Sequence, residues 1–418
     1  MKRYILLVFV FFIVYSSQLW SQIPAGPSYY NDFPVMTLSG DGVSVKSHIF
    51  VAKNGWVYYM SLFFNSNTDV QQLVISRTKD FGITYSVICG REFNSNISGR
   101  LVDCDFVVTG QNESDMLIWI ATVVNAQSGN KSAIYLDKLD SDGLFVETNY
   151  IWEFPDASDE FYSVSIATDD RSPASVSSPY SIAVASTGYL AGKDKLLYLV
   201  KSNPGSMFSI VSLYSTPVKG SLGKVSNSLG VWQEQSEGVS TIAFEMDKNS
   251  SGQGNVGLLA NNYLFSNTGW STPFDVSFLI PNQSAKPAVC SVLNSQLSVT
   301  SAGFLVTMED YSLGSQDIGL FCITPSESFE LNSQPTLSSF SYNHIGYGDG
   351  ICQQSPSLGF DKLYNNYLLT FQENNSLKYL FNYFGMLGSS WTDYGNYRDR
   401  ETQMNYNASP HVDINPIQ

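Results

Sequence analysis

One landmark recurs six times along this chain at a nearly constant interval. In each copy a strand-like apolar run and a polar turn are followed by an aromatic residue. The six aromatic residues are Tyr85, Phe145, Phe208, Trp270, Phe329 and Trp391, and successive members lie 59 to 63 residues apart. A fixed period of this length is the signature of stacked or radially repeated units, so we expect one structural unit in six copies.

The first unit predicts four short strands joined by tight turns. Residues 43–52 alternate in polarity and end at the turn Lys53-Asn54-Gly55, and residues 56–64 form a strongly β-prone run. Polar turns then separate two further runs, 71–76 and 83–89. Short β-branched and aromatic runs divided by Gly, Asn, Asp and Ser are typical of hairpins. Four antiparallel strands per unit make one blade of a β-propeller.

A second landmark supports the same period independently. Similar positions in the second predicted strand are held by Val57, Ile118, Ile182, Ile242, Leu305 and Leu368, spaced by 60 to 64 residues. A β-solenoid needs a much shorter repeat, and two sandwiches would not share this register. The sequence therefore predicts an all-β protein, a single propeller domain over 22–418 with six four-stranded blades. The expected blades are residues 41–93, 101–153, 160–215, 221–277, 284–331 and 350–394.

The last residues leave two alternatives open. Ser409-Pro410-His411-Val412 resembles two blade openings, Lys286-Pro287-Ala288-Val289 and Ser355-Pro356-Ser357-Leu358. Either residues 412–414 close the ring by pairing with residues 34–38, or the chain is a truncated seven-bladed ring. We favour closure, because an open strand edge invites aggregation.

The N-terminus predicts a cleaved export signal over residues 1–21. Lys2 and Arg3 precede an apolar run over residues 4–15, and a small residue, Ser21, precedes the expected cut before Gln22. This run is shorter than the roughly 20 residues that span a bilayer. We therefore expect a secreted or cell-surface protein without a membrane span in the mature chain. A signal ending in Ser-Gln before Asn-, Ser- and Tyr-rich strands resembles envelope proteins of the Bacteroidetes type.

Charge and cysteine content narrow the partners and the chemistry. The formal charge is −15 and no Lys/Arg cluster is present, which disfavours nucleic acid as a partner. A glycan or a surface protein is the expected partner, and no cofactor is expected. Cys89 and Cys104 are the best candidates for a disulfide between neighbouring units, and the alternative is that the cysteines are buried thiols.

Residues Thr78-Lys79-Asp80-Phe81-Gly82-Ile83-Thr84-Tyr85 resemble the Asp-box of bacterial neuraminidase (BNR) repeats. Asp80 can accept backbone N–H bonds across the turn, Gly82 permits positive φ, and Tyr85 packs between hairpins. Weaker copies lie at 140–145 and 266–270. The resemblance implies a sialidase-like propeller in which the box is structural and lies opposite the catalytic face.

The arginines depart from that family's pattern. Sialidases resemble one another in an arginine triad whose first member lies in an Arg-Ile-Pro setting, and no arginine here has that setting. Sialic-acid hydrolysis is therefore not the expected activity.

Acidic residues that end the second strands are the candidate catalytic groups. Glu245, Glu309 and Glu373 end the second strands of neighbouring blades and should meet on one face. Glycoside hydrolysis needs two carboxylates about 5 to 10 Å apart. The alternative is that these acids are solvated or cap backbone groups.

Candidate ligand-binding residues are Asp310, Tyr342, His344 and Tyr347, of which the last three belong to a glycine-rich segment expected to form a loop on the same face. No metal site is expected, because the histidines are far apart and Asp140-Ser141-Asp142-Gly143 lacks the further ligands of a calcium loop.

Together these features favour an exported propeller that acts as a binding or adhesion module for glycan or protein. The alternatives are an exo-acting glycoside hydrolase of sialidase-like fold and a structural fragment of a larger surface protein. A charged, water-accessible pair among the three glutamates around one pocket would favour the enzyme.

Overall fold

The computed structural model consists of β-strands throughout its described part. It describes residues 42–65, 67–80, 84–94, 99–110, 112–127, 131–146, 150–168, 181–201, 207–231, 238–261, 269–277, 280–292, 303–312, 314–323, 340–345, 350–361, 366–373, 376–382 and 392–397. These residues form 24 strands in six four-stranded sheets, all within the unit Val35–Gln418. The described residues include no helix with the length and hydropathy needed to cross a bilayer.

The first three sheets follow one another along the chain. Their strands are β1 (Gly42–Val51), β2 (Val57–Asn65), β3 (Val70–Thr78), β4 (Ser86–Asn94), β5 (Arg100–Thr109), β6 (Leu117–Asn125), β7 (Ser132–Asp140), β8 (Tyr150–Phe154), β9 (Glu160–Thr168), β10 (Ile182–Leu190), β11 (Lys193–Lys201) and β12 (Ser209–Thr216).

The last three sheets repeat this plan. Their strands are β13 (Val225–Val231), β14 (Gly238–Met246), β15 (Asn255–Asn261), β16 (Phe274–Asp275), β17 (Ser284–Val292), β18 (Gly303–Asp310), β19 (Asp317–Ile323), β20 (Phe340–Ile345), β21 (Gln353–Asp361), β22 (Asn366–Glu373), β23 (Ser376–Asn382) and β24 (Thr392–Tyr397).

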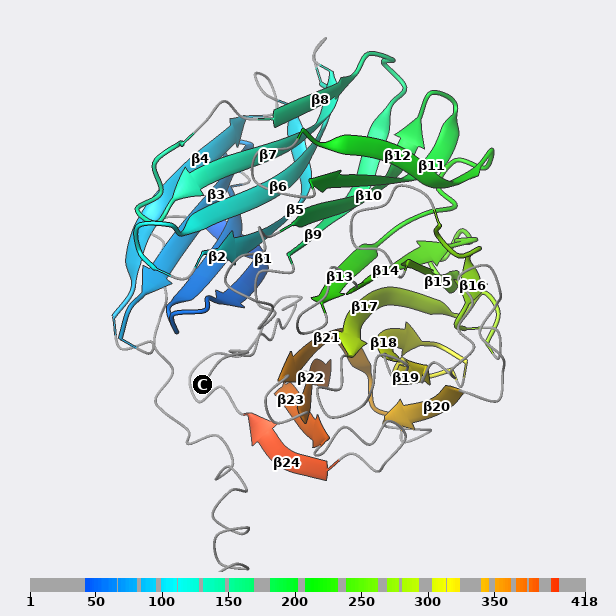
Figure 1. The fold of residues 1–418 in the computed structure, drawn as a ribbon. Coiled ribbons are helices and arrows are strands. Elements are labelled where there is room, and N and C mark those ends of the chain that lie inside the picture. Colours follow the sequence, from blue (N-terminus) through cyan, green and yellow to red (C-terminus); the bar gives the residue numbers. More distant parts are fainter. Residues whose placement is uncertain are drawn as a thin grey trace, which may run out of the picture. The chain divides into compact units, whose positions relative to one another are not determined.

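Each sheet is an antiparallel meander whose strands lie in sequence order. The first strands of successive sheets pack against one another, β5 on β9, β9 on β13, β13 on β17 and β17 on β21. Figure 1 shows the six sheets following one another around a centre that their first strands face. The predicted fold class is confirmed: the protein is an all-β propeller of six four-stranded blades.

The sequence landmarks fall at equivalent places in the blades. The six aliphatic residues of the second landmark all lie in second strands. Tyr85 and Phe208 directly precede fourth strands, β4 and β12, whereas Phe329 and Trp391 lie outside the described residues. The period arises because each blade needs the same four backbone hydrogen-bonded strands.

Burial decreases from the middle of a blade to its outer edge. Strand β6 is buried along seven consecutive residues, whereas β12 alternates between exposed and half-buried positions. A second strand has a neighbouring blade on both faces, so it is apolar on both sides, whereas a fourth strand has one wet side. This difference explains why the second strands gave the cleaner sequence signal.

One sequence expectation is wrong in the described part. Tyr342 and His344 belong to strand β20 and not to a loop, because residues 340–345 supply the fourth strand of the fifth blade. Of the two alternatives for Cys89 and Cys104, the structure has free thiols: Cys89 lies on the outermost strand of one blade and Cys104 on the innermost strand of the next. The predicted signal over residues 1–21 and the closing segment 412–414 lie outside the described residues.

A glycine at the turn between β7 and β8 generates a prediction about stability. Gly143 has φ +83° and a Cβ there would lie 2.2 Å from the Ile88 carbonyl oxygen in the first blade, whereas Gly192 has φ +79° and open space around it. We expect Gly192→Ala to lower the free energy of unfolding by about 1 kcal/mol and Gly143→Ala by about 3 kcal/mol, because only the latter adds a clash to backbone strain. Urea unfolding measures both, and equal losses would contradict the close approach of blades one and two.

Candidate functional site

The first strands of all six blades line one central cavity of about 930 Å³. Its wall includes Lys46 and His48 of β1, Asp105 of β5, Lys224 just before β13 and Lys286 of β17. In the first two blades the charged lining residues come before apolar ones such as Phe50 and Val107 along the first strand, so one end of the cavity is charged and the other is hydrophobic. A concave site with a few convergent polar groups is the usual place for a ligand.

Two residue pairs join the first and second blades at the charged end. Lys46 Nζ donates to Asp103 Oδ1 and, over 2.8 Å, to the Cys104 carbonyl oxygen. Two residues further along both strands, His48 Nδ1 lies 3.0 Å from Asp105 Oδ1. Since i and i+2 side chains share one face of a strand, both pairs lie on the same side of their strands.

The His48–Asp105 pair has the electrostatics of an oriented base. Burial and the nearby Lys46 ammonium lower the pKa of His48, which keeps the imidazole neutral near pH 7. Burial alone would raise the pKa of Asp105, but His48, Lys46 and the Ile166 N–H outweigh it and lower the value to about 2. If Nδ1, 3.0 Å from the carboxylate, carries the proton of the neutral imidazole, Nε2 is left as a proton acceptor.

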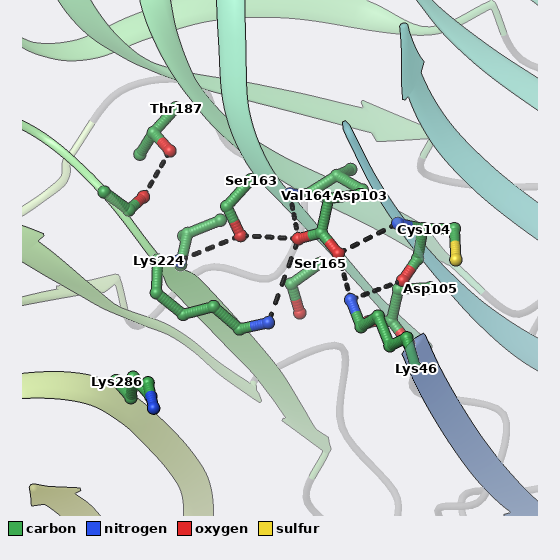
Figure 2. A network of polar contacts seen from close by, with 12 residues as sticks. Lys46, Asp103, Cys104, Asp105, Ser163, Val164, Ser165, Thr187, Lys224 and Lys286 are labelled. Carbon is green, nitrogen blue, oxygen red and sulfur yellow. Dashed lines mark hydrogen bonds and ion pairs between the residues drawn. The ribbon is translucent and has the colours of Figure 1, made fainter. Parts of the chain in front are cut away.

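Asp103 links four blades, as Figure 2 shows. Its Oδ2 accepts from Ser163 Oγ at 2.7 Å and from the Val164 N–H at 3.0 Å, both in the third blade. The ammonium of Lys224, from the fourth blade, lies 3.9 Å from the same oxygen. Burial opposes ionisation of Asp103, but Lys224, Lys46 and Ser163 lower its pKa below the ordinary range.

Glu245 joins the fourth and fifth blades in the same manner. Its Oε2 accepts from the Lys224 N–H at 2.8 Å and lies 3.1 Å from Lys248 Nζ, while Oε1 accepts from the Lys286 N–H at 2.7 Å. Gly223 permits this close packing, because a Cβ there would lie 1.9 Å from Glu245 Oε2.

Glu309 makes the equivalent bond between the fifth and sixth blades. Its Oε1 accepts from the Ser355 N–H at 2.7 Å and from Lys286 Nζ at 3.1 Å, and its Oε2 accepts from the Tyr311 hydroxyl. Both donating N–H groups belong to residues with positive φ that directly precede a proline, Lys286 (48°) and Ser355 (55°). The repeated Lys-Pro and Ser-Pro openings are thus β-bulges held by a glutamate of the preceding blade.

The structure separates the acidic residues predicted from the sequence. Glu245 lines the cavity, whereas Glu309 is fully buried in the wall. Glu373 accepts from Gln353 Nε2 at 3.1 Å and pairs with Lys378 at 3.0 Å. The three glutamates therefore provide no pair of carboxylates that both face the cavity. Glu245 and Glu309 mainly accept hydrogen bonds from backbone N–H groups.

The predicted ligand-binding residues of the fifth blade do meet, but away from the cavity lining. Asp310 Oδ2 accepts from the Tyr342 hydroxyl at 2.9 Å and lies 2.9 Å from His344 Nδ1. Tyr342 crosses β19 over Gly319, where a Cβ would lie 2.4 Å from its hydroxyl oxygen. Tyr347 lies outside the described residues.

Lys46, Asp103, Asp105 and Lys224 were not among the residues predicted from the sequence. A usable signal was present, because first strands carry polar residues two positions apart, as in Lys46/His48 and Asp103/Asp105. A strand that is otherwise apolar gains charged pairs on one face only where that face meets a polar cavity.

Two turns away from the cavity share one pattern of hydrogen bonds. Asp80 accepts from the Thr84 hydroxyl at 2.6 Å through Oδ2, and from the Thr84 N–H at 2.9 Å and the Thr78 hydroxyl at 2.7 Å through Oδ1. These bonds lower its pKa to about 2. Asp140 Oδ1 likewise accepts from the Leu144 N–H at 2.9 Å. Each aspartate therefore accepts the N–H of the residue four positions later and closes its turn. The predicted box residue Gly82 lies outside the described residues.

No protein-family model and no curated protein sequence matches the chain. Among solved structures it is similar to a mutant NanB sialidase from Streptococcus pneumoniae (10% identity, TM-score 0.47), covering 79% of this chain and 65% of that one. It is also similar to an α-L-arabinofuranosidase from Fusarium graminearum (9%, 0.48, covering 83% and 94%) and an α-L-arabinanase from Penicillium chrysogenum (10%, 0.41, covering 84% and 80%).

The fold and the site therefore define a β-propeller of six described blades with a charged central cavity. The chain spans about two thirds of the pneumococcal sialidase. The favoured sequence interpretation, a non-enzymatic binding or adhesion module, is wrong, because the structures of similar fold named above are glycoside hydrolases.

The low pKa of Asp105 generates a prediction about acid stability. A carboxyl with a folded pKa of about 2 and an ordinary value of 3.8 contributes about 2 kcal/mol above pH 4, and this contribution is lost as the pH falls from about 4 to about 2. Between about pH 4 and about pH 2, the free energy of unfolding should fall by about 2 kcal/mol less in Asp105→Asn protein than in the wild type. Urea unfolding at both pH values tests this.

The exposed Glu113 gives the matched control, since Glu113→Gln removes a carboxylate that pairs with Lys79 at the surface. This variant should keep the acid sensitivity of the wild type. An Asp105→Asn protein as acid-sensitive as the wild type would contradict the assigned ionisation.

Proposed function

We propose that the protein is a glycoside hydrolase whose active site is the charged end of the central cavity. The observation that carries the proposal is the Asp105–His48 pair in the cavity wall, an ionised carboxylate beside a neutral imidazole. Such a pair can activate water or stabilise the positive charge that develops on a sugar ring.

Glycoside hydrolysis commonly uses a second carboxyl group across the bond that breaks. Among the described residues that line the cavity, Glu245 is the other carboxylate, but both of its oxygens accept backbone N–H groups and it is turned into the wall. We therefore assign catalysis to Asp105 with His48 and a positioning role to Glu245. Because first strands of all six blades surround the cavity, a chain end fits it better than the middle of a polymer, and this supports exo-action.

Export and the repeat family belong to the same proposal. We take residues 1–21 as a signal peptide and the mature protein as secreted or at the cell surface, in the style of the Bacteroidetes envelope. The matching Asp80 and Asp140 turns support BNR-type Asp-boxes. The proposed partner is a glycan substrate, and the charge of −15 argues against nucleic acid.

Cleavage of a panel of aryl glycosides and oligosaccharides by the full chain tests the proposal. We expect Asp105→Asn to lower turnover by about 10³-fold and His48→Gln by about 10²-fold, because each removes part of the base. Reducing-sugar release and chromatography of the products measure the rates.

Asp142→Asn is the control variant, since Asp142 is an exposed aspartate that pairs with Arg77 and does not line the cavity. It should keep its turnover per folded molecule. The proposal fails if no glycosidic bond is cleaved, or if Asp105→Asn and Asp142→Asn turn over equally.

A further inference from the structure

We propose that the cavity binds a negatively charged group of the glycan, a sulfate ester or a uronic carboxylate, through the ammonium groups of Lys224 and Lys286. The inference rests on the proposed function only in taking the ligand to be a glycan. The anion site itself follows from how charge is distributed over the cavity wall.

The side chains that line the cavity carry more positive than negative charge, and Asp103 and Glu309, which balance three of the lysines, lie behind them in the wall. Its lining contains four lysines, Lys46, Lys224, Lys248 and Lys286, against the carboxylates Asp105 and Glu245. The whole chain has a formal charge of −15. A cleft lined by one sign of charge, with apolar walls beneath it, concentrates ligands of the opposite sign.

The positively and the negatively charged side chains also point in different directions. The side chains of Lys224 and Lys286 are 40% and 49% exposed, whereas those of Asp103, Glu245 and Glu309 are 7%, 5% and 0% exposed. The carboxylates are turned into the wall, where they accept backbone N–H bonds. A molecule in the cavity therefore meets ammonium groups first.

Glu245 fixes the two lysines relative to each other. Its two oxygens accept the backbone N–H groups of Lys224 and Lys286, one on each side. Lys286 is fixed further by its bulge and by Glu309, which binds its ammonium at 3.1 Å. Both side chains thus leave the wall from anchored backbone positions, so little ordering is needed when an anion binds.

The residue type indicates how this site recognises its ligand. Arginine pairs with a planar carboxylate through two parallel bonds, whereas lysine acts as a point charge with three rotatable donors. Lys224 and Lys286 therefore select for charge more than for planar shape, and a tetrahedral sulfate suits them as well as a carboxylate does.

Calorimetric titration of the full chain with sodium sulfate, sodium glucuronate and neutral glucose tests the inference. We use Asp105→Asn protein, so that binding is measured independently of cleavage. We expect saturable binding of at least one anion and none of glucose, weakening with added sodium chloride. Binding of sulfate alone assigns a sulfate ester, and binding of glucuronate assigns a carboxylate.

Charge-removing variants locate the site. Lys224→Gln and Lys286→Gln should each weaken anion binding about tenfold, the effect of one charged hydrogen bond. Lys131→Gln removes the same charge at the surface, where Lys131 pairs with Glu153, and should bind as before. If Lys286→Gln fails to fold because Glu309 is left unpaired, Lys286→Gln with Glu309→Gln removes both charges.

Two results would overturn the inference: no saturable binding of either anion, or binding unchanged when both cavity lysines are replaced. Neither depends on catalysis. Lysine-dependent anion binding by a chain that cleaves no glycan would leave the site standing and refute the hydrolase.

Discussion

The bond on which this propeller depends joins a side chain of one blade to the backbone of the next. The first strand of each blade pairs with a second strand on one side only, so its other edge presents unpaired N–H groups to the centre. Asp103, Glu245 and Glu309 each accept such an N–H from the following blade, at Val164, Lys286 and Ser355. Two serines make equivalent bonds. The Ser163 hydroxyl oxygen accepts from the Val225 N–H, and the Ser226 hydroxyl oxygen accepts from the Val289 N–H. The blades are thereby held at fixed angles around the cavity.

The same bonds determine the charge of the cavity. A carboxylate that accepts backbone N–H groups of the next blade is turned into the wall, and a buried negative charge needs a cation beside it. Lys46, Lys224 and Lys286 supply those cations from the starts of the first strands. Because a lysine side chain is long, its ammonium can balance the buried charge and still face the cavity. Assembly of the ring thus leaves positive charge where a ligand enters.

The architecture could be predicted from the sequence because a blade's requirements are local. Four hydrogen-bonded strands and a doubly buried second strand repeat in every unit, and residues such as Ile118 and Ile242 record them. The fourth strand of the fifth blade was not predicted. It is formed by residues 340–345, whose neighbouring glycines are typical of a loop although the residues pair with β19. The candidate acids ended second strands as expected, but whether an acid faces a cavity or caps an N–H depends on contacts between blades. Asp105 and His48, 57 residues apart, meet only when the ring forms.

The two sides of the cavity are suited to different tasks. Blades one and two present the Asp105–His48 pair, and blades four and five present Lys224 and Lys286. Asp103 connects them, bound closely by Lys46 and more loosely by Lys224 at 3.9 Å. An incoming anion can replace that looser contact at small cost, because Lys46, Ser163 and Val164 still satisfy Asp103. Under the proposed function, a sugar held by its charge at Lys224 would extend towards Asp105 and His48, so recognition and bond cleavage would occupy neighbouring parts of one cavity.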